Sequence, residues 1–178
     1  MFKPICLALA LMFLAVPPLQ AEQINGEEVT TVEWEALMPA DFTMDHIFDS
    51  QEDLAMLDDF DPKAEAKLKE MMNLLQSAPV VAAMDGKMIR IPGFVVPLEG
   101  DGQRVTTFFL VPYFGACIHT PPPPSNQIIH VSYEPGTKVE NLFDAVWITG
   151  KLRTEDFSHE MGAAGYVMEA YQIEPYAL

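Results

Sequence analysis

Residues 104–111 read Arg-Val-Thr-Thr-Phe-Phe-Leu-Val, and this stretch decides the fold class. β-branched and aromatic residues are typical of strands, and the apolar alternation predicts that one face of this strand is buried. Outward from it, comparable stretches lie at 80–84, 88–96, 127–133, 145–152 and 165–173. Turn-forming segments such as Glu99-Gly100-Asp101-Gly102 separate them. We therefore expect residues 79–178 to form a mainly β domain.

Five or six short strands of this kind must pair or close their edges to avoid exposing unpaired backbone groups. The strand count and length fit a small, partly open β-barrel of the oligonucleotide/oligosaccharide-binding (OB) type, with a β-sandwich as the alternative. Asp85-Gly86 between 80–84 and 88–96 predicts a tight hairpin. A short helical interruption is expected around 138–143.

An acidic extension, residues 22–78, precedes this domain and lacks strand alternation. Asp61-Pro62 is a typical helix start, with Asp as the N-cap and Pro in the first turn. Apolar residues then recur at helical spacing, at Ala64, Leu68, Met71, Met72 and Leu75. The pattern predicts one helix over 62–76 that packs one face against the barrel.

Composition excludes several classes of protein. With 49% hydrophobic residues the chain is too apolar to be disordered. Ten basic residues against 26 acidic ones give a formal charge of −16, which repels nucleic acids and anionic lipids. We therefore expect no nucleic-acid partner.

Residues 1–21 have the three parts of a secretory signal peptide: Lys3, an apolar run, and a small residue, Ala21, at the expected cleavage point. The apolar run is shorter than the roughly 20 residues that cross a bilayer, so no transmembrane segment is expected in the mature protein. Cleavage also removes Cys6 and leaves Cys117 as a lone thiol. The sequence thus predicts a soluble periplasmic protein whose single cysteine is exposed to oxidation unless it is buried or bound.

The most unusual motif is Gly115-Ala116-Cys117-Ile118-His119, followed by four prolines at 121–124 and by Asn126-Gln127. With the segment 92–98 and Trp34, it resembles the exported bacterial family called domain of unknown function 3299, over residues 34–175. The resemblance implies export and domain identity but no reaction. It also implies an association with envelope transport systems, so a transporter component is the expected partner.

Cys117 and His119 are two residues apart, which places both side chains on one face of an extended segment. A thiolate beside an imidazole is half of a tetrahedral zinc site and also suits copper. His130 could enter from the far side of the proline loop, and the three ligands would leave one open position. We therefore expect zinc or copper at Cys117, His119 and His130.

Three other interpretations of these residues stay open. Cys117 and the histidines could simply be packed in the core. The stiff proline loop or the barrel face could serve a metal-free protein-interaction module, although a brace for the flanking segments is the favoured role of the prolines. His119 could activate Cys117 in a thiol enzyme, but no orienting carboxylate is identifiable, so catalysis is not favoured. His46 and His159 are expected to be solvated surface residues, and Asn126 to bond local backbone.

The sequence-based expectation is therefore a soluble periplasmic accessory or binding protein that carries or senses a transition metal for an envelope transport system. The metal-free interaction module is the first alternative, and the thiol-dependent enzyme is the second.

Overall fold

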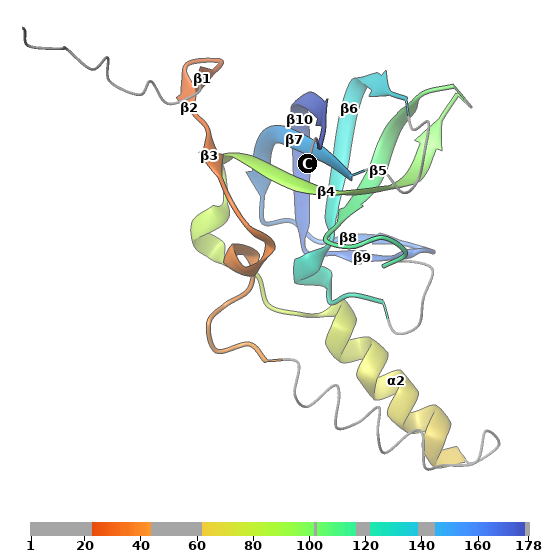
Figure 1. Cartoon of the computed structure of the whole chain (residues 1–178). Coiled ribbons are helices and arrows are strands. Elements are labelled where there is room, and N and C mark those ends of the chain that lie inside the picture. The colour runs from red at the N-terminus through yellow and green to blue at the C-terminus, as the bar shows by residue number, and fades with distance from the viewer. Residues whose placement is uncertain (1–22, 44–61, 102, 117–121, 139–144, 177–178) are drawn as a thin grey trace, which may run out of the picture.

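The computed structural model describes residues 23–43, 62–101, 103–116, 122–138 and 145–176. Its centre is a closed five-stranded barrel (Figure 1). The strands are β4 (Met88–Gly100), β5 (Val105–Val111), β6 (Ile129–Thr137), β7 (Ala145–Arg153) and β10 (Tyr166–Pro175). The predicted small β-barrel is confirmed, and the sandwich alternative is wrong.

The barrel closes because β4 pairs antiparallel with β5 through one half and with β7 through the other. The remaining neighbours are β5 with β6, β6 with β10 and β10 with β7. The β6–β10 pair is parallel and aligns Tyr166–Glu169 with Ile129–Ser132. A closed barrel leaves no long exposed strand edge, which removes the usual site of edge-to-edge aggregation.

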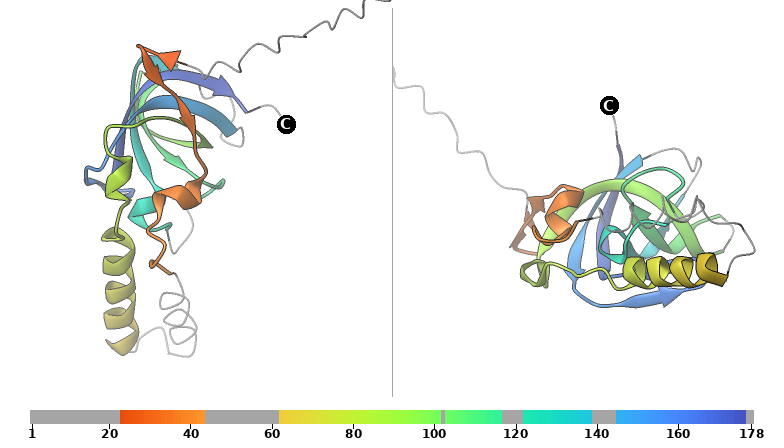
Figure 2. Two further views of the ribbon diagram at one scale, coloured as in Figure 1. Left: turned by 90° about the vertical axis from the view of Figure 1, so that its left-hand side faces the viewer. Right: turned by 90° about the horizontal axis from the view of Figure 1, so that it is seen from below.

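Three short strands, β1 (Gln23–Ile24), β2 (Glu27–Glu28) and β3 (Thr30–Thr31), precede the barrel, and β3 pairs with the start of β4. Helix α2 (Pro62–Gln76) has the predicted bounds and projects away from one end of the barrel (Figures 1 and 2). Met71 and Leu75 are buried, whereas Leu68 is 44% exposed. Burial among the described residues is thus confined to the C-terminal half of the helix.

A second small sheet, the hairpin of β8 (Phe157–His159) and β9 (Gly162–Ala164), lies between β7 and β10 in the chain. Three short 3-10 helices complete the described elements: η1 (Trp34–Leu37), η2 (Ala82–Met84) and η3 (Ser125–Gln127). No helix in these described parts of the chain is long and apolar enough to cross a membrane.

The hairpin predicted at Asp85-Gly86 is wrong, because residues 82–84 form η2 instead of a strand. The backbone N–H of Val81 donates to the Tyr166 hydroxyl (2.7 Å), which holds this segment across the barrel end instead of along β4. Gly86 has a positive φ of 73° and its N–H donates to Leu152. Asp85-Gly86 is therefore a turn that leads into β4, whose strand partner on this side is β7. The expected helix around 138–143 falls almost wholly outside the described residues.

Polar side chains from two parts of the motif attach the N-terminal segment to the barrel. The Trp34 indole donates to the Pro92 carbonyl (2.7 Å), and the Gln127 amide donates to the Trp34 carbonyl (2.9 Å). The Asn126 amide donates to Pro79 (2.8 Å), so the expectation of a purely local bond for Asn126 is wrong. These residues hold separate segments together and so have a structural role.

Tyr166 joins three segments from the buried interior. Its hydroxyl donates to the Leu37 carbonyl (2.9 Å) and accepts from Val81, and its side chain is fully buried. We expect Tyr166→Phe to lower the free energy of unfolding by about 1–3 kcal/mol, because two backbone groups lose their partner. Urea denaturation of both proteins measures this. An unchanged midpoint would show that the two hydrogen bonds contribute nothing.

Burial raises the pKa of Tyr166 above its ordinary value near 10, although the hydrogen bond from Val81 opposes the shift. Below about pH 10 the tyrosine is protonated in both folded and unfolded chains, so its contribution to stability is complete. Above that pH the unfolded chain loses the proton first, and stability falls. We expect wild type to lose stability between pH 9 and 11 more steeply than Tyr166→Phe. Parallel slopes in thermal melts across this range would contradict the assignment.

Candidate functional site

The outer face of β5 and β6 carries a second apolar cluster, separate from the barrel interior. Phe108 and Leu110 face the interior core, whereas Phe109 and Val111 belong to the outer cluster with Ala116, Ile128 and Ala164. Alternate residues of one strand therefore feed two cores, as the period of a strand requires. The β8–β9 hairpin supplies Phe157, Met161 and Ala164 to this cluster.

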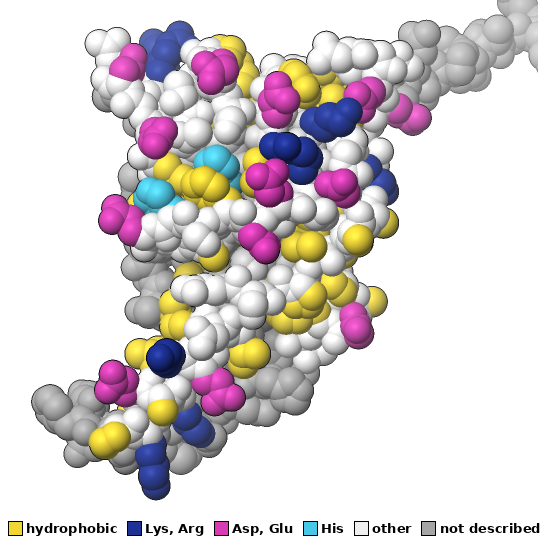
Figure 3. Space-filling model, turned by 180° about the vertical axis from the view of Figure 1, so that it is seen from behind, with side chains coloured by type: hydrophobic (Ala, Val, Ile, Leu, Met, Phe, Trp, Pro, Cys, Tyr) yellow, Lys and Arg dark blue, Asp and Glu magenta, His cyan; other side chains and the backbone are white. Residues whose placement is uncertain are grey.

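Four rings meet here, and we call Phe109, His130, Phe157 and His159 the histidine face. His130 and Phe157 are stacked, with ring centroids 3.6 Å apart and planes inclined by 10°. Phe109, fully buried, presents an edge-to-face contact to each of the other three rings at 6.0–6.3 Å. Figure 3 shows two histidine side chains on either side of exposed hydrophobic atoms, with acidic side chains nearby.

The register of the sheet explains why His130 joins this face. His130 of β6 lies directly opposite Phe109 of β5, so both side chains leave the same side of the sheet. Phe157 and His159 are two residues apart in β8 and also share a side. The stack thus connects the β8–β9 hairpin to the barrel wall.

His130 has an unusual polar environment. Its Nδ1 is buried and has no hydrogen-bond partner among the described residues. Burial lowers the pKa of His130, the carboxylates of Glu99 and Glu155 oppose that shift, and His159 adds to it. The imidazole is therefore uncharged at neutral pH, which is the form that binds metal ions.

His159 is half-buried against Phe109 and is not the isolated, solvated residue expected from the sequence. Its Nδ1 accepts a hydrogen bond from the backbone N–H of Met161 (3.2 Å). In the neutral ring the proton therefore sits on Nε2, which makes that nitrogen a donor and not a free metal ligand.

Of the three residues expected to bind metal, His130 is described and Cys117 and His119 lie outside the described residues, as does His46. The residues on either side of 117–121 are described. Ala116 is buried in the outer cluster with Phe109, and Pro122 and Pro123 line a cavity that His159 also lines. Within the described ranges, no group of three or more His, Cys, Asp or Glu side chains could hold a metal ion.

Sequence reasoning missed Phe109, Phe157 and His159 as parts of this face. The stretch Phe157–Ala164 combines short apolar segments with Gly162, which is a weak hairpin signal. What places it over β6 is the length of the β7–β10 connection, and no local pattern shows that contact.

Comparison with known proteins identifies the family. The family model described as "Protein of unknown function (DUF3299)" matches residues 34–175. The crystal structure of a DUF3299 family protein from Pseudomonas aeruginosa PAO1 aligns with a TM-score of 0.63 and 36% identity, covering 83% of this chain and 96% of that chain. No curated protein matches the chain. The chain belongs to the DUF3299 family, as the resemblance in its motif indicated.

Proposed function

We propose that the chain is an exported periplasmic accessory protein that binds zinc or copper through Cys117, His119 and His130 and serves an envelope transport system. The observation that carries this proposal is the environment of His130, whose buried Nδ1 lacks a hydrogen-bond partner among the described residues. Such an orphaned nitrogen is costly unless another group satisfies it. A bound metal ion would do so.

The course of the chain supports Cys117 and His119 as the other ligands. The chain leaves the described region at Ala116 and returns at Pro122, and both residues lie at the side of the barrel that carries the histidine face. Pro123 and Pro124, next in sequence, are buried. Proline has a restricted backbone, so this end of the segment is stiff, and little ordering entropy is lost when a ligand binds.

The donor set suits these metals. Thiolate and imidazole are zinc ligands, and copper accepts both. Three protein ligands leave one coordination position for water or for a group of the partner. The metal would also occupy a lone thiolate that is otherwise open to oxidation in the periplasm.

Equilibrium dialysis against zinc or copper(I) tests the proposal. We expect stoichiometric binding by wild type and at least a tenfold loss of affinity for Cys117→Ser, His119→Ala and His130→Gln. His46→Gln is the matched control, because it removes a histidine outside the proposed set. Equal binding by the control and the three variants would overturn the ligand assignment.

Export is tested separately. We expect the mature protein to begin at Glu22 and to be released in soluble form, since Ala21 ends the proposed signal peptide. N-terminal sequencing of the periplasmic protein measures this. A membrane-bound product that retains Lys3 would contradict it.

A metal-free interaction module is the second candidate, and the exposed apolar residues on the outer face favour it. Phe94, Val96 and Leu98 of β4 pack against the outer cluster but are only partly buried. Beside them, Phe114 is 40% exposed and meets Phe94 edge to face. This alternative predicts partner binding that survives a chelator and fails in Val96→Glu.

A further inference from the structure

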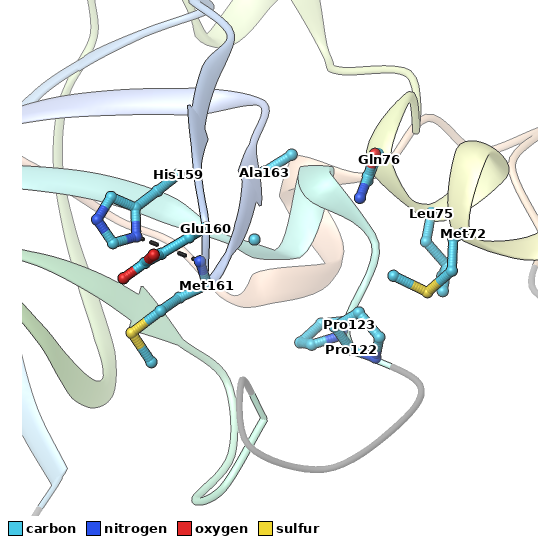
Figure 4. Close-up of a pocket in the computed structure, with 10 residues that line it drawn as sticks. Met72, Leu75, Gln76, Pro122, Pro123, His159, Glu160, Met161 and Ala163 are labelled. Carbon is cyan, nitrogen blue, oxygen red and sulfur yellow. Dashed lines mark hydrogen bonds between the residues drawn. The ribbon is translucent and has the colours of Figure 1, made fainter. Parts of the chain in front are cut away.

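A small cavity lies where three parts of the chain meet: the end of α2, the proline segment and the β8–β9 turn (Figure 4). Its volume is about 110 Å³. The lining residues are Met72, Leu75, Gln76, Pro122, Pro123, His159, Glu160, Met161, Gly162 and Ala163. The cavity lies beside the histidine face and shares His159 with it.

The volume limits what can enter. Sites for cofactors and drug-sized molecules measure roughly 300–1,000 Å³, so this cavity is too small for them. It exceeds the roughly 30 Å³ that a water molecule occupies in the liquid, so several waters or one side chain would fit. A single side chain from another protein is the occupant that matches this size.

The walls select the kind of side chain. Met72, Leu75, Pro122 and Pro123 offer apolar surface, and Glu160 is the one formally charged residue among those that line the cavity. Lysine and arginine combine an apolar stem with a cationic head, so they can cover apolar walls and reach a carboxylate at once. The overall charge of −16 also favours a basic partner.

The cavity is held by contacts on each side. Leu75 is 1% exposed and Pro123 is buried, so these walls keep their positions. On the third side, the hydrogen bond from Met161 N–H to His159 braces the turn. A preformed pocket loses little entropy on binding, while the flexible Met72 and Met161 side chains can adapt to the guest.

We propose that this cavity receives a lysine or arginine side chain of a partner protein, with the stem against Met72, Leu75 and the prolines and the cationic head at Glu160. The proposal goes beyond metal binding and does not depend on it. A failed metal titration leaves it standing, and a failed peptide titration leaves the metal site standing.

Nuclear magnetic resonance of isotope-labelled methionine methyl groups tests the proposal in the full mature chain. The probe is acetyl-Gly-Lys-Gly amide, compared with the same peptide carrying arginine, norleucine or glutamate. We expect the lysine or the arginine peptide to shift the signals of Met72 and Met161. The signals of Met84 and Met168, buried in the barrel core, should not move. Whichever cationic peptide binds more tightly identifies the guest.

Two variants sharpen the result. Glu160→Gln changes an exposed residue and should weaken the cationic peptide about fivefold. Ala163→Leu should fill the cavity and abolish the shifts. Glu134→Gln, an exposed carboxylate on β6, is the matched control and should bind as wild type does. The proposal is overturned if norleucine binds as well as lysine, if Glu160→Gln has no effect, or if no cationic peptide shifts Met72 and Met161.

Discussion

Replacing Phe109 by alanine is expected to lower the free energy of unfolding by about 3–5 kcal/mol, the usual range for a buried phenylalanine. Phe109 is fully buried and its ring contacts His130, Phe157 and His159. The substitution would leave a void between the barrel wall and the β8–β9 hairpin. Domains of this kind have total stabilities of about 5–15 kcal/mol, so the loss is a large share. Urea denaturation measures it.

Phe114→Ala is the matched control for this prediction. Phe114 also meets another aromatic ring, Phe94, but is 40% exposed. We expect it to cost about 1 kcal/mol or less, because an exposed side chain loses little burial when truncated. Equal losses for the two variants would mean that the outer cluster is not a second core of the protein.

Metal is expected to raise the melting temperature of the mature protein in a concentration-dependent way. A ligand that binds only the folded chain stabilises it by RT ln(1 + [L]/Kd), which is about 4 kcal/mol at a thousandfold excess over Kd. For a domain of 150–250 residues, each kcal/mol corresponds to roughly 2–4 °C. Thermal melts with zinc or copper(I), compared with melts in chelator, measure the shift.

The variants decide which residues carry that shift. Each variant is compared with its own metal-free form. Cys117→Ser, His119→Ala and His130→Gln should lose the shift, whereas His46→Gln and His159→Gln should keep it. His159 is expected to be dispensable because its Nδ1 is engaged by the Met161 N–H. Retention of the full shift in Cys117→Ser would refute the thiolate as a ligand.

Much of the fold could be predicted from local pattern. The helix over 62–76 follows from Asp61-Pro62 and the apolar spacing, which are local signals of a start and a face. The barrel strands lie close to the predicted stretches, because β-branched and aromatic runs indicate strands wherever they pair. Strand ends moved: β4 runs on to Gly100, and β6 begins at Ile129 and not at Gln127.

The error at Asp85-Gly86 has a physical cause. A glycine turn between two apolar stretches has the same local signature whether the chain folds back on itself or turns toward a distant strand. Here the deciding contacts are remote in sequence: Val81 bonds Tyr166, and β4 pairs with β7. No short-range pattern contains either partner.

The candidate site was only partly accessible to sequence reasoning. His130 was singled out by its place after the proline loop, yet its stacking on Phe157 depends on the β8–β9 hairpin returning over β6. Asn126 and Gln127 belong to the same motif but serve long-range backbone contacts instead. The spacing of a motif therefore did not separate residues that join segments from residues that could bind a ligand.

Elemental analysis of the protein purified from the periplasm, beside its Cys117→Ser variant, tests the proposed metal site most directly. The proposal predicts stoichiometric zinc or copper in wild type and a loss of most of it in Cys117→Ser, with both proteins folded by circular dichroism. Wild type that carries neither metal, or a variant that carries as much metal as wild type, would contradict it.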